Sequence, residues 1–105
     1  MLSMRSAVLT MLLAVVGAAD LWAAGDPEIG RAIAERWCAS CHVIAPEGSG
    51  SDAAPAFPAI AADPGRTAPG LRAFLTEPHF PMPNPQLSRS EIDHIVAYIE
   101  SLGPQ

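Results

Sequence analysis

The chain has 105 residues, which is enough for one domain at most. Its net charge is −5, with six Arg and no Lys, so it lacks the basic surface that a nucleic-acid-binding protein needs. Beyond residue 24, Ala, Pro and Gly are abundant and large apolar side chains are few, so the core is thin and needs a disulfide, a metal or a cofactor to stabilise it.

Residues 1–24 have the pattern of a secretory signal peptide. Arg5 precedes an apolar run over residues 7–19, and small residues end at two candidate cleavage points, Ala19 and Ala24. The run is shorter than the roughly 20 apolar residues that span a bilayer as a helix. We therefore expect a signal peptide over 1–24, a domain over 25–105 and export across the inner membrane to the periplasm, with an uncleaved membrane anchor as the alternative.

A helix is predicted over residues 26–37. Asp26 suits the N-cap and Pro27 the first helical position. A spacing of four residues predicts that one apolar stripe is buried, formed by Ile29, Ile33 and Trp37.

The two cysteines directly follow this helix, as Cys38 and Cys41, with His42 next in the chain. A disulfide would close a loop too short to add much stability, and a thioredoxin-like pair needs a βαβ frame for which no strand pattern is present. A zinc site would have to recruit His79 and His94 as well. Covalent haem is the fourth interpretation, and the signal peptide favours it: two thiols at this spacing can add to the porphyrin vinyl groups while the adjacent imidazole binds iron.

A loop and a shorter helix are predicted next. The Gly- and Ser-rich residues 47–52 indicate a mobile surface loop. A helix over residues 68–76 would bury three apolar side chains, Leu71, Phe74 and Leu75.

The last helix has the clearest pattern. Ser88 and Glu91 form a capping box, and Gly103 with Pro104 ends the run. The spacing predicts a buried stripe of Ile92, Ile95, Val96, Ile99 and Leu102.

A glycine inside the first helix indicates where the two terminal helices meet. Gly30 costs about 1 kcal/mol relative to Ala at such a position. We therefore expect another element to approach it closely, with Ile95 and Tyr98 of the last helix beside it.

Met82 is the one methionine beyond the signal segment, and it lies between Pro81 and Pro83. A thioether is a weak iron ligand, so a proline-rich loop that is ordered before the bond forms suits it. The rival ligands are His79, on the same loop, and His94, which we expect on a solvated face of the last helix.

These features together resemble those of the class I cytochromes c, small single-haem electron carriers, over essentially all of residues 25–105. The resemblance rests on Gly30, the Cys38–His42 motif, Pro55 in its Ala- and Pro-rich segment, Met82 and Tyr98. It implies an all-α fold in which crossed N- and C-terminal helices pack around one covalently bound haem.

The resemblance also implies a site, with no catalytic residue in it. It gives thioether bonds at Cys38 and Cys41, axial ligands at His42 and Met82, and a hydrogen bond from the second nitrogen of the histidine to the Pro55 carbonyl. The side chains expected to line the haem pocket are Phe57, Ile60, Leu71, Phe74 and Leu75.

The implied function is electron transfer rather than enzymatic catalysis. A periplasmic carrier would shuttle one electron between redox partner proteins through its haem c iron and would have no small-molecule substrate. The acidic chain lacks the Lys ring of vertebrate-type members and favours partners with a basic docking patch. Two alternatives are a haem c subunit of a larger dehydrogenase or oxidase, and a peroxidase or gas sensor with a labile Met82 ligand. Membrane contact is expected only if the N-terminal segment stays uncleaved.

Overall fold

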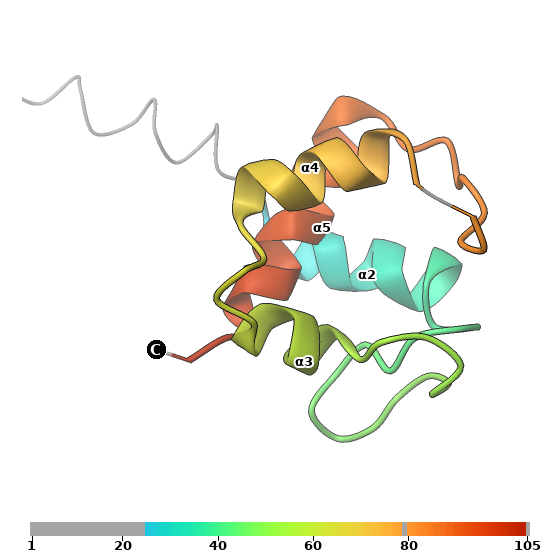
Figure 1. Ribbon diagram of the computed structural model, residues 1–105, viewed down its shortest axis with the longest axis vertical. Helices are drawn as coiled ribbons and strands as arrows, with labels where there is room; N and C mark the ends of the chain where they lie inside the picture. Colours follow the sequence, from blue (N-terminus) through green and yellow to red (C-terminus); the bar gives the residue numbers. More distant parts are fainter. Residues whose placement is uncertain (1–24, 79, 105) are drawn as a thin grey trace, which may run out of the picture.

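The computed structural model describes residues 25–78 and 80–104, which form four helices and no strand. They are α2 (Pro27–Trp37), α3 (Phe57–Ala62), α4 (Ala68–Thr76) and α5 (Arg89–Ser101) (Figure 1). Helix α5 contacts the other three helices and packs most extensively against α2. The predicted all-α class is confirmed.

Side-chain caps explain why three of these helices begin where the sequence predicted. The Asp26 carboxylate accepts a hydrogen bond from the Glu28 backbone N–H at 2.8 Å, and the Thr67 hydroxyl caps α4. At α5 the Ser88 hydroxyl accepts from the Glu91 N–H at 3.2 Å, and the Glu91 carboxylate accepts from the Ser88 N–H at 2.9 Å. Each cap satisfies backbone donors that the first helical turn leaves without an internal partner.

Helix α3 was not predicted. It has only six residues, its N-cap is Ala56 and no side chain caps it. Its residues are mainly Ala and Pro, so neither a cap nor an apolar period marks it in the sequence. Burial of Phe57 holds it in place.

The crossing of α2 and α5 is centred on Gly30, which is buried. A Cβ at this position would overlap the backbone carbonyl of His94 and lie 2.8 Å from the Cβ of Tyr98. The expected approach of Tyr98 is confirmed, and the second contact is the His94 carbonyl rather than Ile95. Only a residue without a side chain lets the two backbones come this close.

The predicted buried stripe of α2 is wrong at two of its three positions, whereas Ile33 is half-buried and packs against the core. Ile29 and Trp37 are 45% and 53% exposed, whereas Gly30 and Ala34 on the adjoining face are buried. The reason is the same close approach: at a tight crossing the buried positions must be small, so the larger side chains turn outward.

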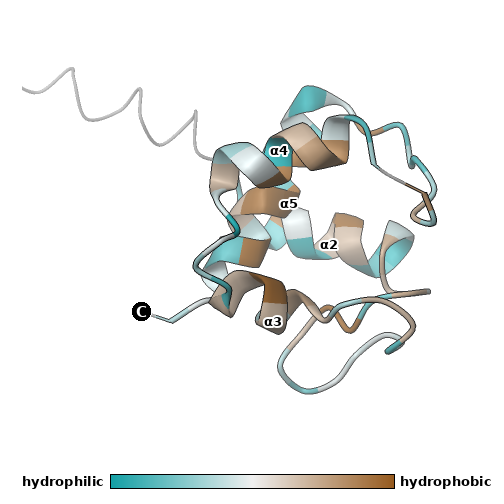
Figure 2. Ribbon diagram, in the orientation of Figure 1, coloured by the Kyte–Doolittle hydropathy of each residue, from teal (hydrophilic) through white to brown (hydrophobic). Residues whose placement is uncertain are grey.

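The core lies between α5 and the segment that follows α2. Its largest fully buried side chains are Ile44, Ile95 and Val96. Apolar residues lie on the inward faces of the helices (Figure 2). The Tyr98 hydroxyl donates a hydrogen bond to the Ile44 carbonyl at 2.6 Å. This bond ties the last helix to the segment that comes directly after the cysteine motif.

The predicted loop over residues 47–52 lies at the surface and is tied to its neighbours. The Ile44 N–H donates to the Ser49 carbonyl at 2.8 Å, and Glu47 forms an ion pair with Arg31 of α2 at 2.8 Å.

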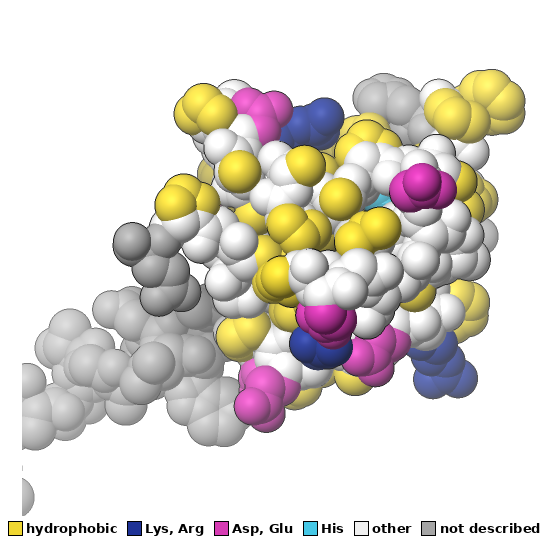
Figure 3. Space-filling model, turned by 90° about the horizontal axis from the view of Figure 1, so that it is seen from below, with side chains coloured by type: hydrophobic (Ala, Val, Ile, Leu, Met, Phe, Trp, Pro, Cys, Tyr) yellow, Lys and Arg dark blue, Asp and Glu magenta, His cyan; other side chains and the backbone are white. Residues whose placement is uncertain are grey.

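Seen from the α3 side, hydrophobic side chains cover much of the surface, and acidic and basic ones lie toward its edges (Figure 3). Within the described ranges no helix has the length and apolar character needed to cross a membrane.

Candidate functional site

The cysteine motif forms a turn at the C-terminal end of α2. Cys38 is the C-cap residue, and its N–H donates to the Ala34 carbonyl at 2.9 Å. The N–H groups of Cys41 and His42 then both donate to the Cys38 carbonyl, at 3.1 and 2.9 Å. This turn brings the three side chains of the motif together at one end of α2.

The two thiols of the motif are free but differ in environment. Cys38 is buried and Cys41 is exposed. Burial raises the pKa of Cys38 to about 11, because the apolar surroundings disfavour the thiolate. One sulfur therefore lies inside the domain and the other at its surface.

The ring of His42 is oriented by two contacts. Its Nδ1 lies 2.6 Å from the Pro55 carbonyl oxygen, and its ring centre lies 5.3 Å from that of Phe57. A carbonyl only accepts, so Nδ1 carries the hydrogen and donates it. The lone pair of the neutral imidazole is then on Nε2, which is the atom available to bind a metal.

An apolar cleft lies beside His42. It encloses about 440 Å³, open solvent included. Its lining combines side chains from the cysteine motif, α3, the connection between α3 and α4, α4, the methionine loop and α5: Cys38, His42, Phe57, Ile60, Arg66, Leu71, Phe74, Leu75, Met82 and Ile99.

The structure brings most of the predicted site residues to this cleft. All five predicted pocket residues line it; among these Phe57, Leu71 and Leu75 are buried. Pro55 is not part of the lining and contributes its carbonyl to His42 instead.

Two cleft residues were not identified from the sequence. Ile99 was assigned to the core stripe of the last helix, and it also faces the cleft. Arg66 lies in an exposed connection between α3 and α4, and no local pattern marks it as a site residue.

Met82 is half-buried and lines the cleft together with His42. The loop that carries it is shaped by Pro81, Pro83 and Pro85, each of which restricts the backbone. A turn follows, in which the Asn84 side chain accepts a hydrogen bond from the Gln86 N–H at 2.8 Å. The cleft therefore contains one imidazole and one thioether.

The sequence offered two histidines as alternatives to Met82 as the iron ligand. His79 lies outside the described residues. His94 is half-buried rather than on a solvated face, and its Nδ1 accepts a hydrogen bond from the Asp26 N–H at 2.8 Å. His94 is absent from the cleft lining, and its contact joins the start of α2 to α5.

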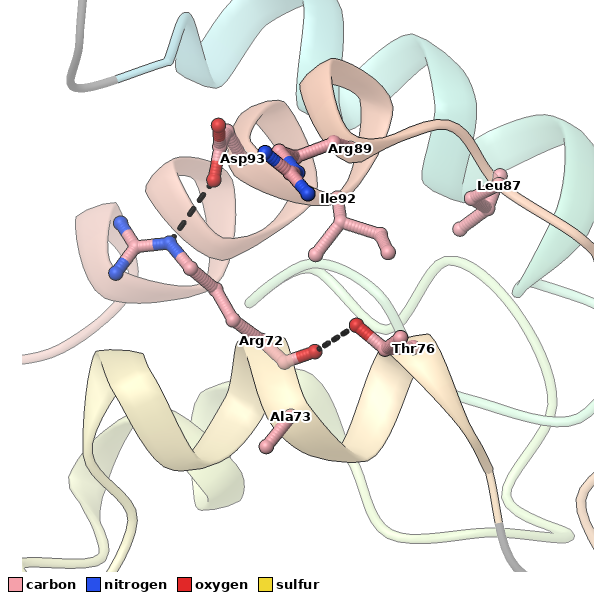
Figure 4. A pocket seen from close by; sticks show the side chains of 7 residues that line it. All are labelled: Arg72, Ala73, Thr76, Leu87, Arg89, Ile92 and Asp93. Atoms are coloured by element: carbon pink, nitrogen blue, oxygen red, sulfur yellow. Dashed lines mark hydrogen bonds and ion pairs between the residues drawn. The ribbon is translucent and has the colours of Figure 1, made fainter.

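A second groove, of about 680 Å³ with open solvent again included, lies between α4 and α5 (Figure 4). Arg72 and Asp93 form an ion pair in its wall, with 2.9 Å between Nε and Oδ1. None of the described residues that line this groove is a cysteine, histidine or methionine. It is therefore not the site that the sequence predicted.

The residues of the apolar cleft fit a covalently bound haem. An apolar wall suits a porphyrin, two thiols suit its vinyl groups, and a neutral imidazole and a thioether suit its iron. Zinc fits less well, because the described residues contain no group of three or more His, Cys, Asp or Glu that could hold a metal ion.

Comparison with known proteins decides the family. The family model for cytochrome c matches residues 27–103. The chain belongs to the cytochrome c family. Its fold, covalent haem c and electron-transfer role follow from that membership, and it is an electron-transfer protein rather than an enzyme.

A bacterial relative supports the same assignment. Cytochrome c-552 of Bradyrhizobium diazoefficiens is 41% identical over 95 residues, which cover 90% of this chain and 91% of the relative. The chain is thus a small class I cytochrome c of the bacterial type. No solved structure matches it at a significant level.

Proposed function

We propose that the protein is a periplasmic one-electron carrier whose single haem c iron has His42 and Met82 as axial ligands. The observation that supports this most strongly is the cleft itself, which is lined by His42, Met82 and Cys38. When bound, haem c supplies a ferrous/ferric couple, and ligation by His and Met raises its potential relative to other ligand pairs.

Cys38 and Cys41 would hold the cofactor covalently. Each thiol would add across one vinyl double bond, with sulfur bonding to one carbon and hydrogen to the other, so nothing would be oxidised or released. The turn that follows α2 holds Cys38 and His42 in the cleft lining and carries Cys41 at the surface beside them. This attachment supplies the interior that the small apolar core lacks.

His42 and Met82 would close the two faces of the iron. The hydrogen bond from Nδ1 to the Pro55 carbonyl directs Nε2 away from that carbonyl and makes the ring a more basic ligand. With His42 and Met82 both neutral and both bound, the coordination would change little between the two redox states. Such a site exchanges electrons and leaves no open position for a substrate.

The acidic surface would select a partner with a basic docking patch. The net charge is −5 and no Lys is present. Electrostatic attraction of this kind raises the association rate and weakens as salt increases.

The test compares reduction by the cationic hexaammineruthenium(II) with reduction by the anionic ferrocyanide over a range of ionic strength. We expect the first rate to fall and the second to rise, and two flat profiles would contradict the steering.

Residues 1–24 would direct the chain to the periplasm and be removed there, leaving a domain over 25–105. The mass of the protein from a periplasmic fraction tests this together with haem attachment. We expect the mass of residues 25–105, or of 20–105 if cleavage follows Ala19, plus one haem. A mass equal to the bare chain would contradict the covalent attachment, and a full-length chain would contradict cleavage.

The ligands are tested by optical spectra of both redox states. We expect haem c bands in the reduced protein and the near-infrared band of sulfur-bound ferric iron in the oxidised protein. Carbon monoxide should leave the reduced spectrum nearly unchanged, because Met82 already occupies the sixth position. A large and immediate shift would instead indicate an open iron and favour a gas sensor or peroxidase.

A further inference from the structure

The groove between α4 and α5 differs in charge from the rest of the chain. Of the seven described residues that line it, Arg72 and Arg89 are basic and Asp93 alone is acidic. The whole chain has 11 acidic residues and six basic ones. The groove therefore has a local excess of positive charge in an acidic protein.

The excess comes from Arg89, which has no counter-ion within the chain. Asp93 follows Arg89 by four positions, the spacing at which a helical ion pair forms. Its carboxylate instead binds Arg72 of α4, with 2.9 Å between Nε and Oδ1 (Figure 4). No hydrogen bond or ion pair joins Arg89 to any other residue in the described part of the chain. Arg89 is also the first residue of α5, where the helix dipole disfavours a cation.

The groove offers apolar surface beside this unpaired cation. Ala73 is exposed on α4, Leu87 is half-buried ahead of α5, and Ile92 joins the core from α5. A guanidinium can donate two parallel hydrogen bonds to one carboxylate. The groove therefore fits an acidic side chain whose neighbours are aliphatic.

Helix α4 separates this groove from the haem cleft. Its two sets of lining residues alternate along the helix and do not overlap. Arg72, Ala73 and Thr76 line the groove, whereas Leu71, Phe74 and Leu75 line the cleft. A protein bound in the groove would thus leave the cleft uncovered.

We propose that this groove docks an acidic, aliphatic segment of a partner protein, with Arg89 binding its carboxylate. The net charge of −5 repels such a segment from the rest of the surface, so the groove also fixes where it binds. This contact goes beyond the proposed attraction to a basic patch. It holds the carrier from the side of α4 opposite the haem cleft and leaves the cleft free for electron exchange with a second protein.

The test is a titration of the isotope-labelled ferrous holoprotein, followed by the NMR shifts of its backbone amides. The probe is a blocked pentapeptide of alternating glutamate and leucine, and the control peptide has glutamine in place of each glutamate. We expect the acidic peptide to shift the signals of Ala73, Leu87 and Ile92, and the neutral peptide to bind roughly fivefold more weakly. Equal binding of the two peptides, or shifts confined to the haem cleft, would overturn the proposal.

Two variants should change the affinity in opposite directions. Arg89→Gln should weaken binding of the acidic peptide roughly fivefold. Asp93→Asn removes the acidic group of the groove and releases Arg72, so it should tighten binding by about twofold or more, which a damaged fold would not do.

The matched control is Arg36→Gln, which removes the same charge from an exposed position in the last turn of α2. Arg36 lies outside the lining of both the groove and the cleft. We expect it to change the affinity by less than about twofold. If Arg36→Gln weakens binding as much as Arg89→Gln, or if Asp93→Asn does not tighten it, the proposal is wrong.

Two further measurements test the place and the occupant. The rate of reduction by hexaammineruthenium(II) should change by less than about twofold when the peptide is bound, and a larger decrease would show that the peptide covers the cleft instead. Without peptide, the groove signals should not depend on protein concentration. If they do, a second copy of the chain occupies the groove and the proposal fails. Neither result depends on which residues ligate the iron, so the proposed His42 and Met82 ligation is tested separately.

Discussion

The crossing of α2 and α5 and the cleft beside it differ in packing: the first is close-packed and the second is open. At the crossing, Gly30 brings two backbones into contact, and protein atoms occupy the place where a Cβ would lie. In the cleft, side chains from six separate segments face a space that is open to solvent. The chain thus stabilises the crossing by its own packing, whereas in the cleft its residues fit a cofactor.

Gly30→Val should damage the crossing most. The added Cβ would overlap a backbone carbonyl that cannot turn away, so the helices must separate. We expect the free energy of unfolding to fall by about 3 kcal/mol or more, measured by guanidinium unfolding of the holoprotein. Gly70→Ala is the control, since Gly70 is exposed in the first turn of α4 and its nearest neighbour is a threonine hydroxyl. A small effect of Gly30→Val would show that the contact is not tight.

Met82→Ala should affect the cleft and leave the crossing intact. We expect a loss of about 2 kcal/mol in stability, loss of the near-infrared band and rapid binding of carbon monoxide. Leu87→Ala is the matched control, because Leu87 is also half-buried but lines the second groove instead of the cleft. A variant that retains a six-coordinate ferric spectrum would show that another residue ligates the iron.

Tyr98→Phe should weaken the link between the two regions. It removes the hydroxyl that donates to the buried Ile44 carbonyl, and we expect a loss of about 1–2 kcal/mol at neutral pH. Thr76→Val is the control, because it removes a similar bond to a backbone carbonyl at an exposed position. The expected loss for that control is smaller, and equal losses would contradict a buried contribution from Tyr98.

The same hydroxyl gives a dependence on alkaline pH. Burial raises the pKa of Tyr98 above its ordinary value of 10. The neutral phenol is favoured in the folded state, so its contribution to stability is complete below pH 10 and declines as pH rises toward the folded pKa. Unfolding measured from pH 8 to 11 should show this decline in the parent protein and not in Tyr98→Phe.

Glu91→Gln should have the smallest effect on the free energy of unfolding, and we expect that effect to be confined to the start of α5. Hydrogen bonds from the backbone and side chain of Ser88 hold the pKa of Glu91 below its usual 4.5. The stabilising contribution of the carboxylate is therefore complete above pH 4.5 and declines as pH falls through the folded pKa. The free energy of unfolding of the parent protein, measured between pH 3 and 6, should include this decline. The decline should be absent in Glu91→Gln and present in Glu100→Gln, which lies at the exposed far end of the helix.

The sequence predicted the elements whose signals are local. Asp26 and the Ser88–Glu91 capping box mark helix starts through bonds made within one turn. Helix α3 has no such signal and depends on burial of Phe57. Its existence is decided by contacts made elsewhere in the chain.

The outward orientation of Ile29 and Trp37 could not be read from helical spacing. Periodicity assigns large apolar residues to the core, but a close crossing requires small ones. His94 was misplaced for a related reason, since its bond to the Asp26 N–H depends on how α2 meets α5. Arg66 enters the cleft only because α3 and α4 fold around it.

The contact between Gly30 and Tyr98 joins residues from opposite ends of the domain. Ribosomes release the N-terminal part of a chain first, so α2 and its cysteine turn emerge long before α5 exists to cover them. The fold cannot close until the last helix has been synthesised, because long-range contacts form only when both partners are present. Until α5 packs against α2, Cys38, whose side chain is buried in the finished domain, stays accessible.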